Sequence, residues 1–387
     1  MTETAKQPPD YRLPRSVLRW VAVGLVLTTA VVIVISVFSG VTPSDLARLG
    51  VVPFGLAAAA SVGRLVVQTA RFRVIATSLA GEPKIDLGGL TIVRMSSEFI
   101  AMSTPSEVGG PVLRAAWLSG KGVDSGKAMW IGYFEVLIEI YVGAAFGLVA
   151  AAYALIKGAT VLGLTIGLIA TVLIVGYTLV FIVPAVKSIK VPHRVFSIAA
   201  FLLGGPRATR FYVRAVVGSL NFSVAAHAIM NRHSLPLLVK SVGLTILEDL
   251  LEGAALWVVL NAMGLKIDFF SATIVAFAAL TIASIPISIG GAGVTELSMQ
   301  SYLLLVYGFS SWAAIVLWRV ATFQVVLAVS GLAFLLLVRK SKGPSKIDLI
   351  RPEEHSPRAP DGRSASPDSG GLRPGMAQLS SDHKRVT

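Results

Sequence analysis

The sequence predicts an all-α fold, a polytopic bundle of membrane helices with six full spans and two re-entrant hairpins of broken helix. Its 387 residues are 54% hydrophobic and only 14% charged, and the mean hydropathy is +0.75. A soluble domain carries about 25% charged residues, so we expect the bulk of this chain in a bilayer. Apolar runs of span length recur along the chain, and the same short motif breaks two of them.

Six uninterrupted apolar runs reach the length of about 20 residues that a helix needs to cross a bilayer. The first follows the mostly polar residues 1–16 and is too long for the apolar part of a signal peptide, so we expect an uncleaved span. A single membrane domain is predicted over 17–340, followed at 341–387 by a Pro-rich segment typical of a disordered tail. The six runs cover residues 17–39, 50–70, 125–156, 161–185, 236–263 and 311–338.

Two further apolar stretches, residues 87–118 and 269–307, are interrupted in the middle by a proline followed after three residues by two glycines. The motifs read STPSEVGGPVLR and SIPISIGGAGVTE. Proline removes a backbone donor, and glycine adopts dihedral angles that other residues avoid, so each motif is expected to end one helix and begin another. The motif residues are Pro105 with Gly109 and Gly110, and Pro286 with Gly290 and Gly291.

The two broken stretches predict an inverted repeat if each enters and leaves the membrane on one side. Three full spans lie between them, so the two hairpins then open in opposite directions. Many transporters are built on such repeats. If each stretch instead crosses as two half-helices, the chain has eight spans. In both cases the broken backbone must be buried in protein or line a wet cavity, because lipid cannot satisfy its polar groups.

Basic residues near the span ends predict a multi-pass protein of the cell membrane with both termini in the cytoplasm. The region after the second span carries Arg71, Arg73 and Lys84, and eight Lys or Arg with no acidic residue lie between 187 and 240. The net charge of +13 is therefore explained by topology and does not indicate nucleic-acid binding. Residues 187–235 are predicted as an amphipathic region on the cytoplasmic face.

Ionisable residues inside the predicted spans are expensive, so each is expected to face a partner or a polar cavity. Structural pairs, such as Arg114 with Glu135 and Glu296 with Arg319, are the alternative to a shared cavity. The candidate substrate-binding and translocation residues are Pro105, Glu107, Gly109, Gly110, Arg114, Glu135, Glu139, Pro286, Gly290, Gly291, Gly293, Glu296 and Arg319. A second set consists of Arg64, Arg94, Glu98, Glu248, Asp249 and Glu252.

The charges suit a lipid headgroup. Arg114 lies one turn into the helix after Gly110, where the positive end of the helix dipole and a guanidinium fork together favour a phosphate. The acids would bind a cationic headgroup or carry a proton, and the residues do not choose between these roles. The chain has no Cys, and its five His lack metal-ligand spacing, so no metal site and no cofactor is expected.

Three segments resemble the lysylphosphatidylglycerol synthase transmembrane domain family, also described as flippase-like integral membrane proteins. They read TPSEVGGPVLRAAWLSGKGV, FEVLIEIY and SIPISIGGAGVTELSMQSYLLLVYGFSSWAAIVLWRVATF, and the resemblance covers roughly residues 15–340. The most specific part runs from Pro286 to Glu296, with Arg319 downstream. Two positions depart from the family pattern: Gly110 replaces a glutamate, and Val136 stands in the Glu-Arg-x-x-Asp motif where the family has arginine.

The resemblance implies a membrane domain that moves a phospholipid or lipid-linked headgroup between leaflets, with anionic lipids as partners. Family members that aminoacylate lipids use a separate soluble domain, which we do not find here, and no catalytic motif is recognisable, so we do not expect an enzyme. Two alternatives stay open from the residues: a proton- or ion-coupled transporter of small solutes, and a non-catalytic scaffold for cell-envelope lipid enzymes.

Overall fold

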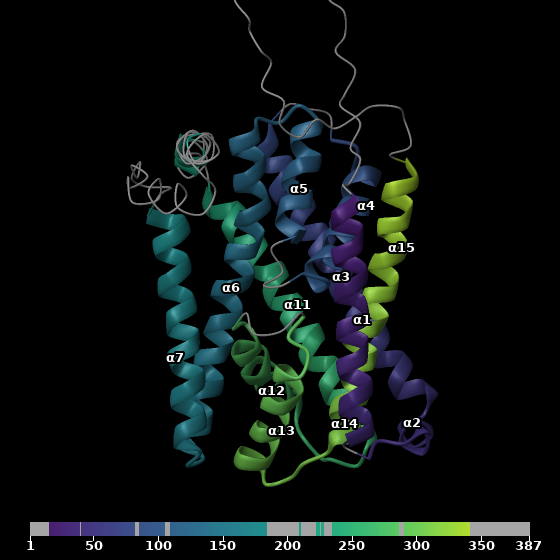
Figure 1. Cartoon of the computed structure of the whole chain (residues 1–387). Helices are drawn as coiled ribbons and strands as arrows, with labels where there is room; N and C mark the ends of the chain where they lie inside the picture. The colour runs from purple at the N-terminus through teal and green to yellow at the C-terminus, as the bar shows by residue number, and fades with distance from the viewer. Residues whose placement is uncertain are drawn as a thin grey trace, which may run out of the picture. The chain divides into compact units, whose positions relative to one another are not determined.

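The computed structural model describes residues 15–38, 40–81, 85–104, 109–183, 209, 222–224, 226–227, 234–285 and 290–340. Every regular element in these ranges is a helix, and together the helices form a bundle (Figure 1). The predictions for residues 1–14 and 341–387, and for most of 187–235, lie outside the described residues and stay predictions.

Twelve α-helices and three single turns of π-helix are described. The π-turns η1 and η2 continue α7 and α13, while η3 joins α14 to α15. The elements are α1 (Arg15–Phe38), α2 (Pro43–Leu49), α3 (Val51–Ala80), α4 (Leu87–Met102), α5 (Gly109–Gly120), α6 (Ser125–Ile156), α7 (Thr160–Tyr177), η1 (Thr178–Ile182), α11 (Ser234–Ala262), α12 (Phe269–Ala283), α13 (Val294–Tyr302), η2 (Leu303–Tyr307), α14 (Trp312–Arg319), η3 (Val320–Gln324) and α15 (Val325–Lys340).

The structure confirms the predicted all-α polytopic membrane bundle. Within the described residues, α3, α6, α7 and the continuous helix Trp312–Arg339 are each long and apolar enough to cross a membrane. The helices α1 and α11, with 24 and 29 residues, have the length as well. The predicted bounds of the spans hold closely except at α3, which continues to Ala80 instead of ending at residue 70.

The first broken stretch is a hairpin of two short helices. At 16 and 12 residues, α4 and α5 are each shorter than the length of about 20 that a span needs. A Cβ added at Gly89 would lie 3.0 Å from the ring of Trp117, and one added at Gly110 would lie 2.9 Å from the carbonyl oxygen of Ser97. Early residues of α4 thus meet late residues of α5, so the chain turns back on itself.

The second broken stretch turns back in the same way. Its arms are α12, with 15 residues, and α13, with nine residues and one further π-turn. The turn between them uses the left-handed backbone region, with φ of +59°, +68° and +85° at Gly290, Gly291 and Gly293, which side-chain-bearing residues rarely adopt. The eight-span alternative therefore describes neither broken stretch.

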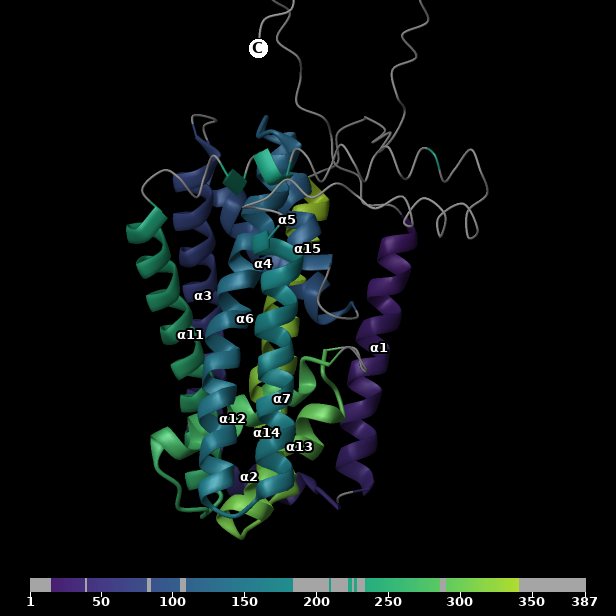
Figure 2. The same cartoon turned by 90° about the vertical axis from the view of Figure 1, so that its left-hand side faces the viewer.

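The two hairpins enter the bundle from opposite ends, and their tips meet. Figures 1 and 2 show α4 and α5 beside the end of the bundle where α15 finishes, and α12 and α13 toward the other end. A Cβ added at Gly290, in the tip of the second hairpin, would lie 3.1 Å from the carbonyl oxygen of Met102, in the tip of the first. This arrangement is the one that an inverted repeat requires.

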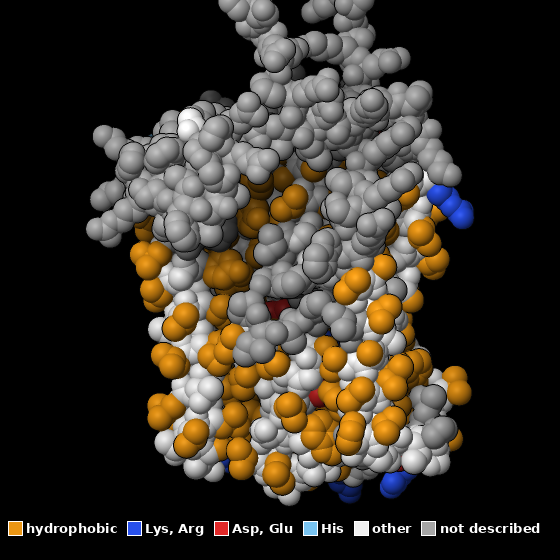
Figure 3. Space-filling model, in the orientation of Figure 1, with side chains coloured by type: hydrophobic (Ala, Val, Ile, Leu, Met, Phe, Trp, Pro, Cys, Tyr) orange, Lys and Arg blue, Asp and Glu red, His pale blue; other side chains and the backbone are white. Residues whose placement is uncertain are grey.

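Glycines let α12 pack closely between two long helices. A Cβ at Gly147 of α6 would collide with Thr281, and one at Gly253 of α11 would collide with Thr273, both on α12. Small residues at helix interfaces are typical of membrane proteins, because packing replaces the hydrophobic effect there. Outside the packed interfaces the surface is apolar: α7, for example, exposes Leu168, and Figure 3 shows hydrophobic side chains over much of the visible face.

We predict that Gly110→Ala destabilises the protein by about 1–3 kcal/mol, the usual cost of overpacking a well-packed site. The added methyl group would press on the carbonyl of Ser97 and push α5 away from α4. Thermal unfolding of the purified protein in detergent measures the change. The matched control is Gly143→Ala in α6, where an added Cβ meets nothing within 4 Å, and which should be neutral or stabilising. Equal effects of the two substitutions would contradict the tight packing of the first hairpin.

Candidate functional site

Glu135, a fully buried residue of α6, binds three arginines from three other helices. Its Oε1 lies 3.1 Å from Nη2 of Arg71 in α3 and 2.9 Å from Nε of Arg94 in α4, while its Oε2 lies 3.1 Å from Nη1 of Arg114 in α5. Arg114 also donates to the carbonyl oxygen of Gly132 at 3.2 Å. A single carboxylate therefore connects α6 to α3 and to both arms of the first hairpin.

Arg71 extends these contacts to a fifth helix. Its Nη1 donates to Oε2 of Glu248 at 2.6 Å and to the hydroxyl of Thr245 at 2.7 Å, both in α11. Its Nη2 also pairs with Glu139, one turn after Glu135 on α6. Glu248 further accepts a hydrogen bond from the amide of Gln68, one turn before Arg71. The side chain of Arg71 has no exposed surface, so its charge depends on these partners.

The remaining charges complete one connected network. Arg94 pairs with Glu98 at 2.9 Å, and Arg64 reaches Glu98 at 3.8 Å and Glu252 at 3.4 Å. We call this network the ionic core; its members are Arg64, Arg71, Arg94, Arg114, Glu98, Glu135, Glu139, Glu248 and Glu252.

Burying the charges of the ionic core costs free energy, and removing one of them from the folded protein costs free energy as well. Moving charges from water into a low-dielectric interior costs several kcal/mol per ion, which mutual attraction offsets only with good geometry. Removing one partner leaves an uncompensated buried charge, at a cost of about 3–5 kcal/mol. The most exposed members are Glu139, with 30% of its side chain exposed, Arg64 with 20% and Glu98 with 14%. Any partner from outside would meet these three first.

A second charged pair holds the tip of the second hairpin. Oε1 of Glu296 lies 3.0 Å from Nε of Arg319, and Oε2 of Glu296 accepts a 2.7 Å hydrogen bond from the backbone of Gly293. Glu296 thus caps the first turn of α13, where a negative charge is favourable. Arg319 also donates to the carbonyl oxygen of Gly290. The pair therefore ties α14 to the glycine turn.

The π-turn after Arg319 brings an aromatic ring between the two hairpins. The guanidinium of Arg319 lies 4.2 Å from the ring centre of Phe323, which belongs to η3. The same ring contacts the position of Gly290, and it packs in one apolar cluster with Met102 of α4. Single π-turns within α-helices often occur at functional sites. Here the turn places Phe323 where the two hairpin tips meet.

The structure sorts the predicted site residues into two groups. Eight of them, including the expected pair of Arg114 with Glu135, belong to the ionic core. Gly290, Gly291, Gly293 and the expected pair of Glu296 with Arg319 gather at the second hairpin. Gly109 and Gly110 begin α5 and pack on α4. Pro105, Glu107 and Pro286 lie outside the described residues. Asp249 forms no ion pair with any described residue.

Arg71 is the residue that the sequence interpretation placed wrongly. The sequence predicts it in a basic region after the second span, as a marker of the cytoplasmic side. However, α3 continues past both Arg71 and Arg73, and Arg71 is buried with three glutamates around it. The available signal was its spacing: Arg64, Gln68 and Arg71 recur at intervals of four and three, which places them on one helix face. The orientation prediction therefore loses one of its basic residues.

We predict that Glu135→Gln lowers the free energy of unfolding by about 3–5 kcal/mol, because three buried guanidinium groups lose their shared anion. The size-matched control is Glu139→Gln on the same helix, whose side chain is 30% exposed, and which should cost less. Thermal unfolding in detergent compares the two variants. If Glu139→Gln is recovered as folded protein and Glu135→Gln is not, this outcome also supports the larger destabilisation of Glu135→Gln. A Glu135→Gln protein as stable as the wild type would contradict the central position of this carboxylate.

We predict energetic coupling between Glu296 and Arg319. The single variants Glu296→Gln and Arg319→Gln should each destabilise the protein, and the double variant should lose less than their sum by about 0.5–3 kcal/mol. A second cycle combines Glu296→Gln with Arg48→Gln, an exposed residue of α2, and should be additive. Unfolding midpoints of all variants in one detergent give both coupling energies. Additivity in the first cycle would show that the pair contributes no coupling.

Comparison with known proteins places the chain in a family. No curated protein and no solved structure matches it. The model of the lysylphosphatidylglycerol synthase TM region matches residues 20–330, which include every helix of the ionic core and both hairpins. The guanidinium groups that surround Glu135 come from α3, α4 and α5. The chain is an integral membrane protein that belongs to the lysylphosphatidylglycerol synthase TM region family.

Proposed function

We propose that the protein moves the headgroup of a phospholipid or of a lipid-linked molecule between the two leaflets of the cell membrane, with both termini in the cytoplasm. The observation that carries the proposal is the ionic core, where four arginines and five glutamates from five helices share partners inside a membrane bundle. Charges within a membrane domain usually mark a substrate or ion pathway.

Exchange of its internal ion pairs for pairs with a lipid headgroup would give the ionic core a function beyond stability. A lipid headgroup carries a phosphate, and many carry an ammonium group as well. The phosphate matches the bidentate geometry of arginine, and the ammonium matches a carboxylate. When such a headgroup replaces one internal ion pair with two external pairs, no charge is left unpaired, so the desolvation cost of the headgroup is offset. Arg64 and Glu139, the most exposed arginine and glutamate of the ionic core, are the groups that would exchange first.

The hairpins support the proposal through their position. They approach from opposite ends of the bundle (Figure 1), and their tips meet at Met102 and Gly290. Half-helices that meet in the middle of a membrane are the usual place for substrate sites in transporters, where one repeat moves against the other. The pair of Glu296 and Arg319, which holds the second tip, would then control whether that tip can move.

We predict that the purified protein in vesicles equalises a fluorescent phospholipid between leaflets. Phospholipid labelled in its headgroup or acyl chain is bleached from outside by a membrane-impermeant reductant, and the bleached fraction gives the transfer rate. Arg64→Gln and Glu139→Gln should each slow transfer about tenfold, the effect of removing an interaction of about 1.4 kcal/mol from the rate-limiting step. The control variants Arg48→Gln and Lys157→Gln, at the ends of α2 and α6, should transfer at the wild-type rate.

The outcome that contradicts the proposal is a wild-type rate equal to that of protein-free vesicles. The comparison needs anionic, zwitterionic and aminoacylated phospholipids and one lipid-linked pyrophosphate, so that a narrow specificity is not mistaken for inactivity. Each variant is first shown to be folded by its unfolding midpoint, so that slow transfer is not a loss of protein.

A further inference from the structure

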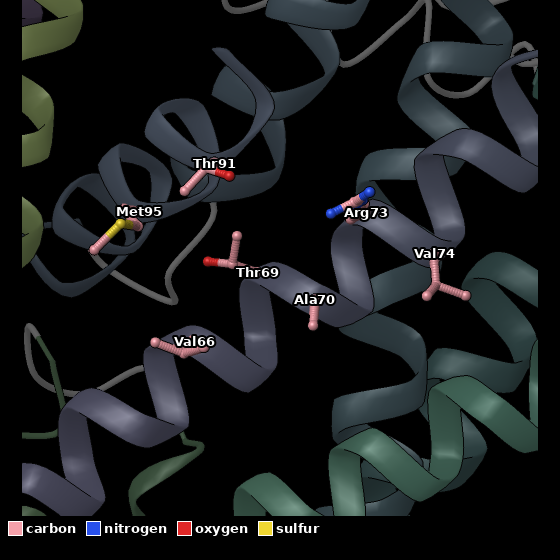
Figure 4. Close-up of a pocket in the computed structure, with 7 residues that line it drawn as sticks. All are labelled: Val66, Thr69, Ala70, Arg73, Val74, Thr91 and Met95. Atoms are coloured by element: carbon pink, nitrogen blue, oxygen red, sulfur yellow. The ribbon is translucent and has the colours of Figure 1, made fainter. Parts of the chain in front are cut away.

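We propose that the groove between α3 and α4 binds one anionic phospholipid, with its phosphate at Arg73 and an acyl chain along the apolar wall. This rests on the proposed function in one respect, since it names where the lipid would enter. The groove has a volume of about 480 Å³, within the range of about 300–1,000 Å³ of small-molecule sites. Figure 4 shows its lining residues, which are Val66, Thr69, Ala70, Arg73, Val74, Thr91 and Met95.

The groove lies on the outer side of α3. Val66, Ala70 and Arg73 follow one another at intervals of four and three, so they share one face of the helix. The buried residues Arg71, a member of the ionic core, and Gln68, which donates to Glu248, lie on a different face. Val66 is 62% exposed, and in a membrane bundle an exposed apolar helix face is covered by lipid. An acyl chain of the surrounding bilayer is therefore the natural neighbour of this wall.

Arg73 gives the groove its charge. The side chain is exposed, and among the residues that the structure describes no carboxylate lies within ion-pair distance of it. It precedes Ala80, the last residue of α3, by seven positions, or about 10 Å along the axis, so it lies near the helix end, where we expect the lipid headgroups. A phosphate at that depth would pair with the guanidinium while its acyl chain follows Ala70 and Val66.

The other polar groups of the groove favour a lipid without a cationic headgroup. The hydroxyls of Thr69 and Thr91 donate to the carbonyl oxygens of Leu65 and Leu87, so among the seven lining side chains only Arg73 offers free donors. The lining contains no carboxylate, so an ammonium group would find no opposite charge there. The groove is therefore more complementary to a phospholipid of net negative charge than to a zwitterionic one.

The groove leads toward the ionic core. Thr91, Met95 and Glu98 follow one another at intervals of four and three on α4, so Glu98 continues the face that lines the groove. Glu98 pairs with Arg94 and Arg64 and is itself 14% exposed. Met95, which lines the groove, thus lies one helical turn from the network. The site would serve as the lateral entrance from the leaflet that surrounds the end of α3.

Photo-crosslinking in vesicles tests the proposal. The full chain is reconstituted with phosphatidylglycerol that carries a photoreactive group on one acyl chain, and in parallel with phosphatidylcholine that carries the same group; labelled peptides are mapped by mass spectrometry. In the wild type, phosphatidylglycerol should label α3 and α4 peptides at least fivefold more than phosphatidylcholine. Arg73→Gln should remove that preference, and Ala70→Trp should lower labelling at least fivefold by filling the groove.

Matched controls separate the groove from general lipid contact. Leu168→Trp adds the same ring to the lipid-facing surface of α7, and Arg48→Gln removes a charge from α2; both should leave labelling of α3 and α4 unchanged. Met95→Trp, which fills the groove from α4, replaces Ala70→Trp if that variant does not fold. Equal labelling by the two lipids in the wild type, or equal labelling of Ala70→Trp and Leu168→Trp, would overturn the proposal.

The transfer assay in the same vesicles keeps the two proposals apart. If the labelling is specific to the groove but no lipid is transferred, the binding site is supported and the translocase function is overturned. If lipid is transferred but neither Ala70→Trp nor Met95→Trp reduces the labelling, the translocase function is supported and the proposed entrance site is overturned.

Discussion

The carboxylate of Glu135, shared by three buried guanidinium groups, is the interaction on which the arrangement of the bundle depends. It requires α3, α4 and α5 to bring Arg71, Arg94 and Arg114 to one point on α6. For that, α3 has to continue beyond its purely apolar part, and the first hairpin has to fold back so that both arms face α6. An unpaired charge in the interior of the bundle costs several kcal/mol, so a packing of these helices that leaves one of these charges without its partner is strongly disfavoured.

The second hairpin also places polar groups inside the bundle, but it satisfies them in a different way. Its glycine turn has left-handed backbone angles and leaves polar backbone groups inside the bundle, where lipid cannot satisfy them. Glu296 accepts from the backbone of Gly293, and Arg319 donates to the carbonyl oxygen of Gly290. The two charges thus neutralise each other and satisfy the turn at the same time, which explains why an acid and an arginine occur together near the broken helix.

These two constructions explain which residues could be predicted from the sequence. The hairpins could, because proline and glycine act locally and the motif occurs twice. The pair of Glu296 with Arg319 and that of Arg114 with Glu135 could be proposed, because a charge in an apolar run needs a partner. Counting basic residues near the span ends treats Arg71 and Arg73 alike, and only the spacing of Arg71 from Arg64 and Gln68 separates the two: Arg71 is fully buried and Arg73 is exposed beside the groove.

The sequence by itself determined the membrane environment, the helical class, the positions of the spans and the two breaks, since all of these follow from local hydropathy and backbone preferences. The tertiary structure alone decided which charges meet. The rotation of each helix about its axis, and the residue at which α3 ends, determine which side chains face one another. Both depend on contacts between residues that are far apart in the sequence, such as Arg71 and Glu248. Hydropathy assigns the same cost to every buried arginine, whereas packing decides which of them finds a glutamate and which faces the lipid.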